Sequence, residues 1–482
     1  MSISCIRNAA WAVVWDGKRG SHGYCRNADV TFSEDGILDV GHDYRGAVDT
    51  EINGEGLLVM PGLINVHSHP SAQPIFRGLT EEFGNPRLFY SSRHDLKQSL
   101  YPDEAAEQAS AEFALAEMLA GGVTTVVDLS HAYPGWLDIL AASGMRVCVA
   151  PMYRSARWYT ETGQATLYDW DEAKGWKDFE EACELMDQAD SHASGRLFSM
   201  FAPAQVDTCT EELLRKSAEV ARQTQRPLHI HAAQSYAEFQ GMTRRHDITP
   251  IEWLNRIGFL SKQTVIGHAV FTDEHPWLHW PARNDLALLS RSGTTVAHCP
   301  TVFARDGTLM HDLGSYRRSG VNLAIGTDTH PHNLLEEMRW AEILARVAAG
   351  SRHSLGTDKV FDFATIGGAN ALLRDDIGRI AVGCQADLVL VDVEQPNMAP
   401  LYDPLRSLVY AAAERAVRDV YVAGRRVVAE GKVLTLDRTR AASGLQQGQQ
   451  RAIEAVPHFD PKRRTITEIA PRTYPLAPDK NP

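Results

Sequence analysis

The 482-residue sequence lacks the features of a membrane or secreted protein. No apolar run approaches the roughly 20 residues that a transmembrane helix needs, and residues 1–15 show no basic-then-apolar signal peptide. An excess of positive charge is also missing, since 48 Lys and Arg face 61 Asp and Glu and give a net charge of −13. Such a charge argues against nucleic acids and anionic membrane surfaces as partners.

Cysteine is sparse as well. The seven cysteines are scattered, odd in number and never in C-x-x-C spacing. This pattern argues against a disulfide framework and against a zinc ribbon, and it favours reduced thiols. We therefore expect a cytoplasmic protein. Its 44% hydrophobic content is enough for a sizeable core.

Residues 1–57 predict short strands separated by turns. Three turn signals divide them: Asp16-Gly17, Asp35-Gly36 and Asn53-Gly54. Alternating apolar residues at 28–32 and 37–40 indicate a half-buried antiparallel sheet, which is too small to be stable without a partner. Strand patterns return at 386–393, 417–423 and 426–428, and we expect them to complete this sheet.

Between these segments, strand and helix patterns alternate. A helix is predicted at residues 103–119 and ends at Gly121-Gly122. Eight apolar strands are expected, the first in the run 56–60 leading toward residue 69 and the others at 123–127, 145–152, 197–202, 228–231, 264–268, 294–298 and 321–327. Continuous apolar strands with intervening helices are typical of a parallel sheet buried on both faces. Eight of them predict an α/β protein with a (β/α)8 TIM barrel.

These patterns divide the chain into three parts. Residues 58–375 would form the barrel, and residues 1–57 and 376–438 a small β-sandwich domain built from both chain ends. The polar, Pro-rich residues 439–482 predict an arm over a neighbouring surface or a disordered segment.

A long insertion at 153–194 follows the third predicted barrel strand. Its first part is rich in aromatic residues and arginine, Trp158 among them. Long loops after barrel strands lie on the face of the active site, so the insertion predicts a lid or substrate wall. An aromatic cluster that merely packs the loop onto the barrel is the alternative.

Titratable side chains stand at the ends of several predicted strands. The first strand ends in His67 and His69, whose i, i+2 spacing on an extended chain points both imidazoles to the same side. His231, His268 and Asp328 end strands five, six and eight. Because the carboxyl ends of barrel strands surround one mouth, these side chains should converge. A single one of them could be structural, whereas all five together indicate a metal site.

These residues lie in motifs that extend over most of the chain: PGLINVHSHP followed by FRGL, EMLAGGVTTVVD, PLHIHAAQ, VIGHAVFTD, VAHCP, GVNLAIGTDT and DDIGRIAVGCQADLVLVD. With these motifs, residues 10–435 resemble the amidohydrolase superfamily, and within it the cytosine-deaminase-like branch. That branch contains triazine chlorohydrolases, guanine-type deaminases and methylthioadenosine/adenosylhomocysteine deaminases. The motifs are specific for the superfamily and weak for the substrate.

The resemblance implies a metal-dependent hydrolase. Its cofactor would be one divalent metal, zinc with iron as the alternative, held by four ligands: His67, His69, His231 and Asp328. It also implies that Asp328 accepts the proton of the attacking water and that His268 hydrogen-bonds water or substrate. The fourth strand is followed by Pro203-Ala204-Gln205 rather than by lysine, so the bridging group of a two-metal site is missing.

One position departs from the deaminases of this branch. They carry H-x-x-E on strand five, where the glutamate moves a proton to a ring nitrogen. Here Gln234 stands in that place, and an amide donates a hydrogen bond but cannot carry a proton. Asp328 alone, His268 or Glu238 are the alternatives for this role, with Gln234 kept as a catalytic candidate. The expected substrate-binding residues are Gln73, Arg77, Trp158, His298 and His330.

Two classes of function are consistent with the sequence. The first is a hydrolase that uses a metal-activated hydroxide on a C–N or similar C–leaving-group bond of a small, nitrogen-rich, cyclic substrate. A true deaminase with a rerouted proton is the alternative within this class. The second class is a non-catalytic scaffold, which predicts loss of ligands, whereas all four are present. We also expect a homodimer or homotetramer with a small-molecule substrate.

Overall fold

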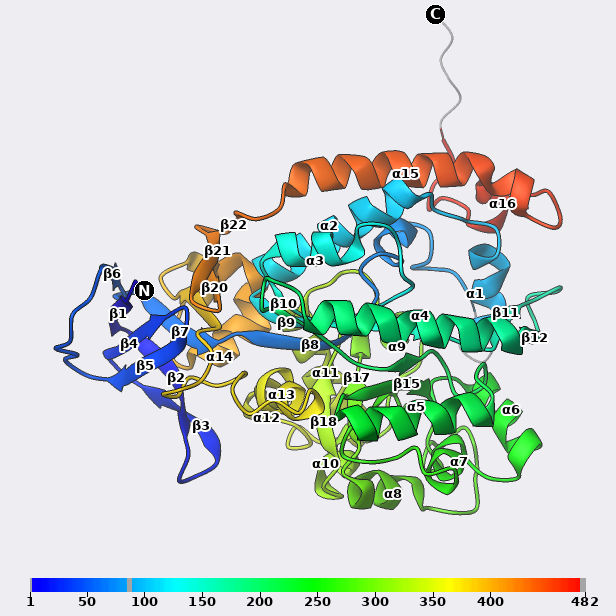
Figure 1. The fold of residues 1–482 in the computed structure, drawn as a ribbon, viewed down its shortest axis with the longest axis horizontal. Coiled ribbons are helices and arrows are strands. Elements are labelled where there is room, and N and C mark those ends of the chain that lie inside the picture. The colour runs from blue at the N-terminus through cyan, green and yellow to red at the C-terminus, as the bar shows by residue number, and fades with distance from the viewer. Residues whose placement is uncertain (1, 85–88, 477–482) are drawn as a thin grey trace, which may run out of the picture.

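The computed structural model describes residues 2–84 and 89–476. Figure 1 shows strands of the N-terminal region gathered at one end, parallel strands and helices in the body, and a long C-terminal helix along one side. None of the helices in these two ranges has the length and apolar content that crossing a membrane requires.

Two sheets at the N-terminal end share one buried apolar cluster, which includes Ile6, Phe32 and Leu388. The smaller has the order β5-β4-β1-β6, with β1 Ser4–Ala9, β4 Ala28–Ser33, β5 Gly36–Gly41 and β6 Thr50–Asn53. The larger has the order β22-β21-β20-β19-β7-β2-β3, with β2 Trp11–Asp16, β3 Ser21–Cys25, β7 Leu57–Pro61, β19 Leu388–Asp392, β20 Val417–Val422, β21 Arg425–Ala429 and β22 Lys432–Val433. Because β7 pairs with β19, the later strands extend a sheet that the first strands begin.

The body of the molecule contains two sheets of parallel strands. One has the order β13-β10-β9-β8, with β14 beside β10, and consists of β8 Leu63–Ser68, β9 Val123–Ser130, β10 Arg146–Tyr153, β13 Leu197–Ser199 and β14 Ala202–Pro203. The other has the order β15-β16-β17-β18, with β15 Leu228–Ala232, β16 Thr264–His268, β17 Thr295–His298 and β18 Asn322–Ile325. Isolated parallel bridges join the two sheets at both margins: Ser68 with Asp328, Phe201 with Leu228 and Gln205 with His231. The carboxyl ends of these strands therefore lie at one side of the molecule.

The prediction that the run 56–60 leads directly into the first barrel strand is wrong. This run forms β7 of the larger N-terminal sheet, and the strand that carries His67 is the separate β8. The strand is interrupted at Gly62, between β7 and β8. The Gly62 N–H donates to the Asp387 carbonyl oxygen over 2.9 Å. An added Cβ there would clash with Thr124, so only glycine fits. One apolar stretch thus holds strands of two different sheets, and apolar character alone does not mark the break.

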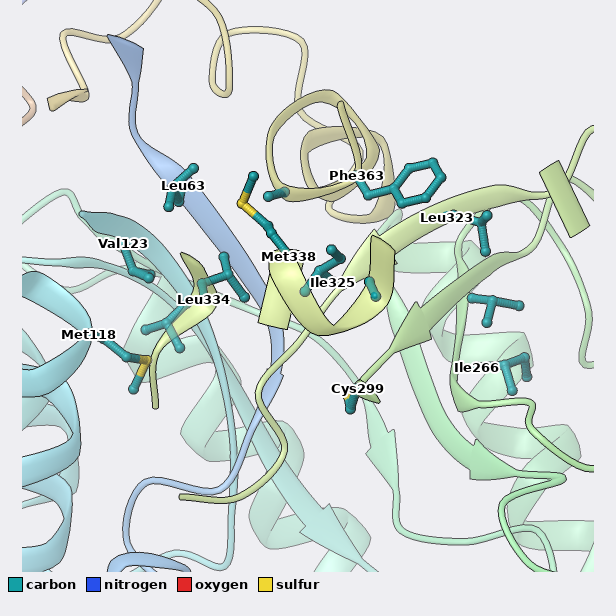
Figure 2. Close-up of a cluster of buried hydrophobic side chains, with 14 of the residues drawn as sticks. Leu63, Met118, Val123, Ile266, Cys299, Leu323, Ile325, Leu334, Met338 and Phe363 are labelled. Carbon is teal, nitrogen blue, oxygen red and sulfur yellow. The ribbon is translucent and has the colours of Figure 1, made fainter. Parts of the chain in front are cut away.

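Helices cover the parallel strands (Figure 1). The predicted helix at 103–119 is confirmed as α2 Glu104–Ala120, which begins where the Asp103 side chain accepts the Ala106 N–H. The larger helices that follow along the chain are α3 Trp136–Ser143, α4 Glu172–Asp190, α5 Glu211–Thr224, α6 Tyr236–His246, α7 Pro250–Arg256, α8 Asp285–Ser292, α9 Pro300–Arg305, α10 Leu313–Arg318, α11 Leu334–Ala349 and α12 Thr357–Asp362. Figure 2 shows how Leu63 of β8, Met118 of α2 and Met338 of α11 contribute to one buried cluster between strands and helices.

Up to residue 476, the described C-terminal residues form a helical arm. Helix α15, Arg438–Phe459, lies along α2 (Figure 1), and its buried side is a stripe of mostly small residues: Ala441, Leu445, Gly448, Ala452 and Val456. The arm then reaches α1, Phe89–Lys97, where Arg464 forms two ion-pair contacts with Asp95, at 2.8 and 2.9 Å. Asp460 accepts the Ser99 hydroxyl over 3.1 Å. The arm thereby fixes α1 in place.

Candidate metal centre and substrate cavity

The strand-end residues lie together at the carboxyl ends of the parallel strands, and all of them are buried: His67, His69, His231, His268 and Asp328. Ligand atoms of His67, His231 and His268 lie within 4.8 Å of one another, and so do those of His67, His69 and Asp328. The fold thus brings together side chains that the sequence places on or just after four different strands.

Four short distances define this centre. Nε2 of His69 lies 3.3 Å from Oδ1 of Asp328, and Nε2 of His67 lies 3.5 Å from the same oxygen. Nε2 of His268 lies 3.8 Å from Oδ2 of Asp328. Nε2 of His231 lies 3.3 Å from Nε2 of His69. The side chains therefore surround a space small enough for a single ion.

Hydrogen bonds behind two of the rings decide which nitrogen faces the centre. Nδ1 of His69 lies 2.6 Å from the Leu129 carbonyl oxygen, and Nδ1 of His231 lies 2.6 Å from that of Ala204. A carbonyl oxygen only accepts, so each Nδ1 carries the proton and each Nε2 presents a lone pair. These lone pairs face each other at 3.3 Å beside the Asp328 carboxylate. Acceptor atoms this close repel one another unless a cation lies among them.

A proton on one of the buried imidazoles does not readily replace a metal cation between these acceptor atoms, because burial disfavours the charged ring. Burial lowers the pKa of His231 well below its ordinary value and that of His67 to about 3, with neighbouring histidines adding to both shifts. Nε2 of His67 is also buried, without a hydrogen-bond partner among the described residues. The donor set therefore fits a divalent metal held by neutral imidazoles and one carboxylate.

His229 of β15 also belongs to this centre, and the sequence reasoning missed it. Its Nε2 lies 2.9 Å from Nδ1 of His67, so it orients that ring from behind. The signal was present, since His229 and His231 repeat the i, i+2 spacing of His67 and His69. Gly267 leaves the room that both rings need, because an added Cβ would lie 2.7 Å from Cε1 of His67.

The backbone around Asp328 is tied directly to β8. The Asp328 N–H donates to the His67 carbonyl oxygen over 2.8 Å, and the His69 N–H donates to the Asp328 carbonyl oxygen over 3.2 Å. Asp328 and His268 both adopt positive φ angles, +57° and +85°. Such left-handed conformations cost a non-glycine residue of order 1–3 kcal/mol and are typical of functional sites. Here they aim a carboxylate and an imidazole at the same point.

A cavity of about 810 Å³ opens from this centre. Its inner end is lined by His69, His231, His268 and Asp328. Its walls come from α1 and from the hairpin of β11, Ala156–Tyr159, and β12, Leu167–Trp170, which lie side by side at one end of the molecule (Figure 1). The long insertion thus contributes a wall of the cavity.

Besides His268 and Asp328, the structure places three of the predicted substrate and catalytic residues in the cavity lining: Gln73, Trp158 and Gln234. Oε1 of Gln73 and Nε2 of Gln234 are both buried without a hydrogen-bond partner among the described residues. Each therefore offers one unused polar atom at the cavity, an acceptor on Gln73 and a donor on Gln234.

Three other predicted substrate residues are not among the described residues that line the cavity: Arg77, His298 and His330. Arg77 forms an ion pair with Glu117. His330 contacts two residues through its ring nitrogens: Nε2 lies 2.9 Å from Oε1 of Glu81, and Nδ1 lies 3.1 Å from the carbonyl oxygen of Gln73. It therefore supports the backbone of Gln73. His298 is buried at the end of β17.

Glu238, one alternative for the proton-carrying role, holds the turn after β15. Its two carboxylate oxygens accept the N–H groups of Ala233 and Gln234 over 2.7 and 3.1 Å. Burial, with Asp207 adding to the effect, raises the pKa of Glu238 well above its ordinary value. The side chain is not among the described residues that line the cavity. Glu238 therefore positions Gln234 and does not face a substrate.

The aromatic hairpin is anchored and also faces the cavity. Nε1 of Trp158 donates to Oδ2 of Asp207 over 3.1 Å, and the Tyr168 hydroxyl donates to the same oxygen over 2.7 Å. Trp158 lies on the cavity side with its ring centre 5.4 Å from that of His94 in α1. The insertion therefore does both things that the sequence suggested: Trp158 lines the cavity as part of a substrate wall, and its hydrogen bond to Asp207 packs the hairpin in place.

Replacing Trp158 with alanine is expected to raise KM about tenfold while kcat and bound metal stay near their original values, because a lost apolar contact of ~1.4 kcal/mol weakens substrate binding alone. Steady-state kinetics and metal analysis measure this. Trp170→Ala is the matched control, since Trp170 lies in the same hairpin but is 44% exposed. Unchanged kinetics with a lower Tm in Trp158→Ala would mean that the ring serves packing alone.

Comparison with known proteins decides the family. The profile of the amidohydrolase family matches residues 58–427, more than three quarters of the chain. The chain belongs to the amidohydrolase family. This membership confirms the resemblance found in the motifs and makes the protein a hydrolase of that family.

Several members of this family are similar to the chain over nearly its full length. A 5-methylthioadenosine/S-adenosylhomocysteine deaminase of Halobacterium salinarum is 30% identical over 89% of this chain and 94% of its own. A 5'-deoxyadenosine deaminase of Methanosarcina mazei is 27% identical over 95% and 100%. Among solved structures, a zinc-bound adenosine deaminase of Xanthomonas campestris has a TM-score of 0.78 at 25% identity, covering 93% and 98%. A zinc complex of atrazine chlorohydrolase from Arthrobacter aurescens has a TM-score of 0.80 at 22% identity, covering 92% and 100%, which supports the shared fold.

Proposed function

We propose that this hydrolase uses one divalent cation, zinc with iron as the alternative, held by His67, His69, His231 and Asp328. The observation that carries the proposal is the pair of inward-facing Nε2 atoms of His69 and His231, 3.3 Å apart beside a carboxylate. When bound, such a cation supplies Lewis acidity that makes water nucleophilic at neutral pH. The reaction is hydrolysis of a C–N or similar C–leaving-group bond in a small nitrogen-rich substrate.

The chain's own groups then handle the proton and the substrate. Asp328 accepts the proton of the attacking water and passes it to the leaving group, because it is the one carboxylate at the inner end of the described cavity lining. Burial lowers the pKa of His268 to about 3, so its neutral ring acts through hydrogen bonds and not as an acid. The unpartnered Nε2 of Gln234 donates a hydrogen bond to the substrate.

Gln234 restricts the substrate further. An amide cannot protonate a ring nitrogen as the nucleophile adds, and Asp328 is left to serve both proton transfers. The carbon under attack should therefore already be electrophilic, through a carbonyl, a thiocarbonyl or a good leaving group. A deaminase that routes its proton through Asp328 is the second candidate, favoured by the deaminase names of relatives that cover nearly the whole chain.

Metal analysis and a product assay test this function together. We expect about one equivalent of zinc or iron per chain, and loss of turnover after chelation that returns on adding zinc. Ammonia released from aminated heterocycles would select the deaminase, whereas released amine, halide or a ring-opened product would select the first candidate. A protein without metal and without turnover on the whole panel would be a scaffold, contrary to the proposal.

We also propose that the two parallel sheets form one closed (β/α)8 barrel over about residues 58–375, with the mixed N- and C-terminal strands as a β-sandwich domain and the C-terminal arm as a third part. The bridges at Ser68–Asp328 and Phe201–Leu228 support closure. The placement of β7 moves the first barrel residue to Leu63.

Replacing Gln234 with alanine should cost only about 1–2 kcal/mol of transition-state stabilisation, the scale of one lost hydrogen bond, measured as kcat/KM. Gln234→Glu, which keeps the size and adds a carboxylate, should not restore the native rate and should create at most weak deaminase activity. A hundredfold increase in the native rate of Gln234→Glu would instead identify glutamine as a defect in a decayed deaminase.

A further inference from the structure

Basic side chains are concentrated on one side of the cavity. Arg93 and Lys97 line it from α1, and Arg154 lines it from the position just after β10. The cluster is unexpected in a chain with a formal net charge of −13. These side chains come from two separate elements, so the cluster is not a run of basic sequence on one solvated helix face.

Two of these cations form no ion pair. Arg93 pairs with Asp306 at 3.4 Å, and Arg157 pairs with Asp169 at 2.9 Å. Within residues 2–84 and 89–476, the side chains of Lys97 and Arg154 have no ion-pair or hydrogen-bond partner. Asp306 and Asp328 act on Lys97, and Asp178 acts on Arg154, only from beyond ion-pair distance. The printed neighbour of Lys97 is an aromatic ring, since its Nζ lies 5.6 Å from the centre of the Phe76 ring.

The acidic residues of the described lining do not neutralise this pair. Asp328 belongs to the metal centre, and Asp169 is paired with Arg157. Glu107 has a raised pKa from burial and from the nearby carboxylates of Glu104 and Asp103, so its own surroundings are acidic. Three acidic side chains thus line the cavity without an ion pair to Lys97 or Arg154.

The charges of the three cations influence one another. Burial lowers the pKa of Lys97 to about 8, and Arg93 and Arg154 add to this shift, while Asp328 opposes it. Lys97 and Arg154 are both half-buried. Unpaired charges removed from water weaken a fold unless something compensates them. An anionic ligand that enters the cavity would provide the missing charge through charge-assisted hydrogen bonds.

We propose that Lys97 and Arg154 form an anion-binding subsite, so that the substrate carries a carboxylate or phosphate group on the side of the cavity that faces α1. The proposal rests on the hydrolase function above and names its substrate class. Arg154 offers a planar guanidinium that can bind two oxygens of such a group, and Lys97 of α1 offers an ammonium. A neutral heterocycle would leave both charges unmatched.

Equilibrium binding to the zinc-loaded, full-length protein tests the subsite with two matched pairs of probes. Orotate against uracil isolates a carboxylate, and uridine 5'-monophosphate against uridine isolates a phosphate. We expect at least one charged member to bind roughly tenfold or more tightly than its neutral partner, the scale of a hydrogen bond to a charged group. The pair that shows the preference tells which anion the subsite takes.

Variants assign that preference to the two residues. Lys97→Met, Arg154→Met and the double variant should lose the preference for the anion, with zinc content and Tm unchanged. Arg157→Met is the matched control, because Arg157 lines the same cavity and is already paired with Asp169; it should keep the preference. If neither orotate nor uridine 5'-monophosphate binds the wild type more tightly than it binds the double variant, the subsite is refuted. The subsite is also refuted if neither probe binds the wild type at all. Zinc content and turnover on the substrate panel are separate readouts, so this proposal and the proposed function can fail independently.

Discussion

Replacing His231 with alanine should remove most of the bound metal and lower kcat/KM by at least roughly 10³-fold, the order lost when a preorganised charge contact is removed from a catalytic centre. His231 contributes one of the two lone pairs that face each other at 3.3 Å, and its ring is fixed by the Ala204 carbonyl oxygen. Without this ligand, three donors remain for the cation. Elemental analysis after gel filtration, followed by steady-state kinetics, measures both effects.

His298→Ala is the matched control for metal content. His298 is another buried histidine at the end of a neighbouring strand, but it is in neither of the groups of converging ligand atoms found among the described residues. It should keep its full metal content. Full occupancy and a wild-type rate in His231→Ala would contradict the ligand assignment.

Replacing Asp328 with asparagine should lower kcat about 10²–10⁴-fold even where metal is restored, because general-base help of this kind is lost while the side chain keeps its size. Asparagine retains an oxygen for the cation but accepts no proton. The variant is assayed across a series of zinc concentrations, so that weakened metal binding and lost proton transfer are separated. The first appears as a shift in the zinc needed, and the second as a lower plateau.

A plateau equal to that of the wild type would show that Asp328 is a ligand without a role in proton transfer. The base would then have to be sought elsewhere in the cavity lining. Glu238 would not serve, because it holds backbone N–H groups, and the low pKa of His268 makes its ring only a weak base.

The convergence of the strand-end residues was predictable because it depends on topology. Parallel strands that share a sheet end at the same side, so His67, His231 and His268 meet whatever the local details. The positions of Arg77 and His330 were not predictable in this way. Both follow a strand end by several residues, and their directions depend on loop turns and on the partners Glu117 and Glu81.

His229 and the helix α15 of the C-terminal arm were missed for different reasons. The i, i+2 spacing of His229 and His231 marks His229 as a candidate, but its role depends on the contact with His67, which lies 162 residues away in the sequence. Residues 439–482 are polar and Pro-rich, and three of the five residues on the buried side of α15 are alanine or glycine, so the sequence suggested no packed helix there. Close packing of Gly448 against Ala106 of α2 is what uses these small residues.

The contacts between the C-terminal arm and α1 join segments that are made at very different times during translation. Asp95 and its partner Arg464 are 369 residues apart, so a nascent chain on the ribosome cannot form this contact until residue 464 has been made. The four proposed metal ligands have all been made by residue 328, well before that point. The contacts that the arm makes with α1, one wall of the cavity, are therefore added only after all four proposed ligands have been made.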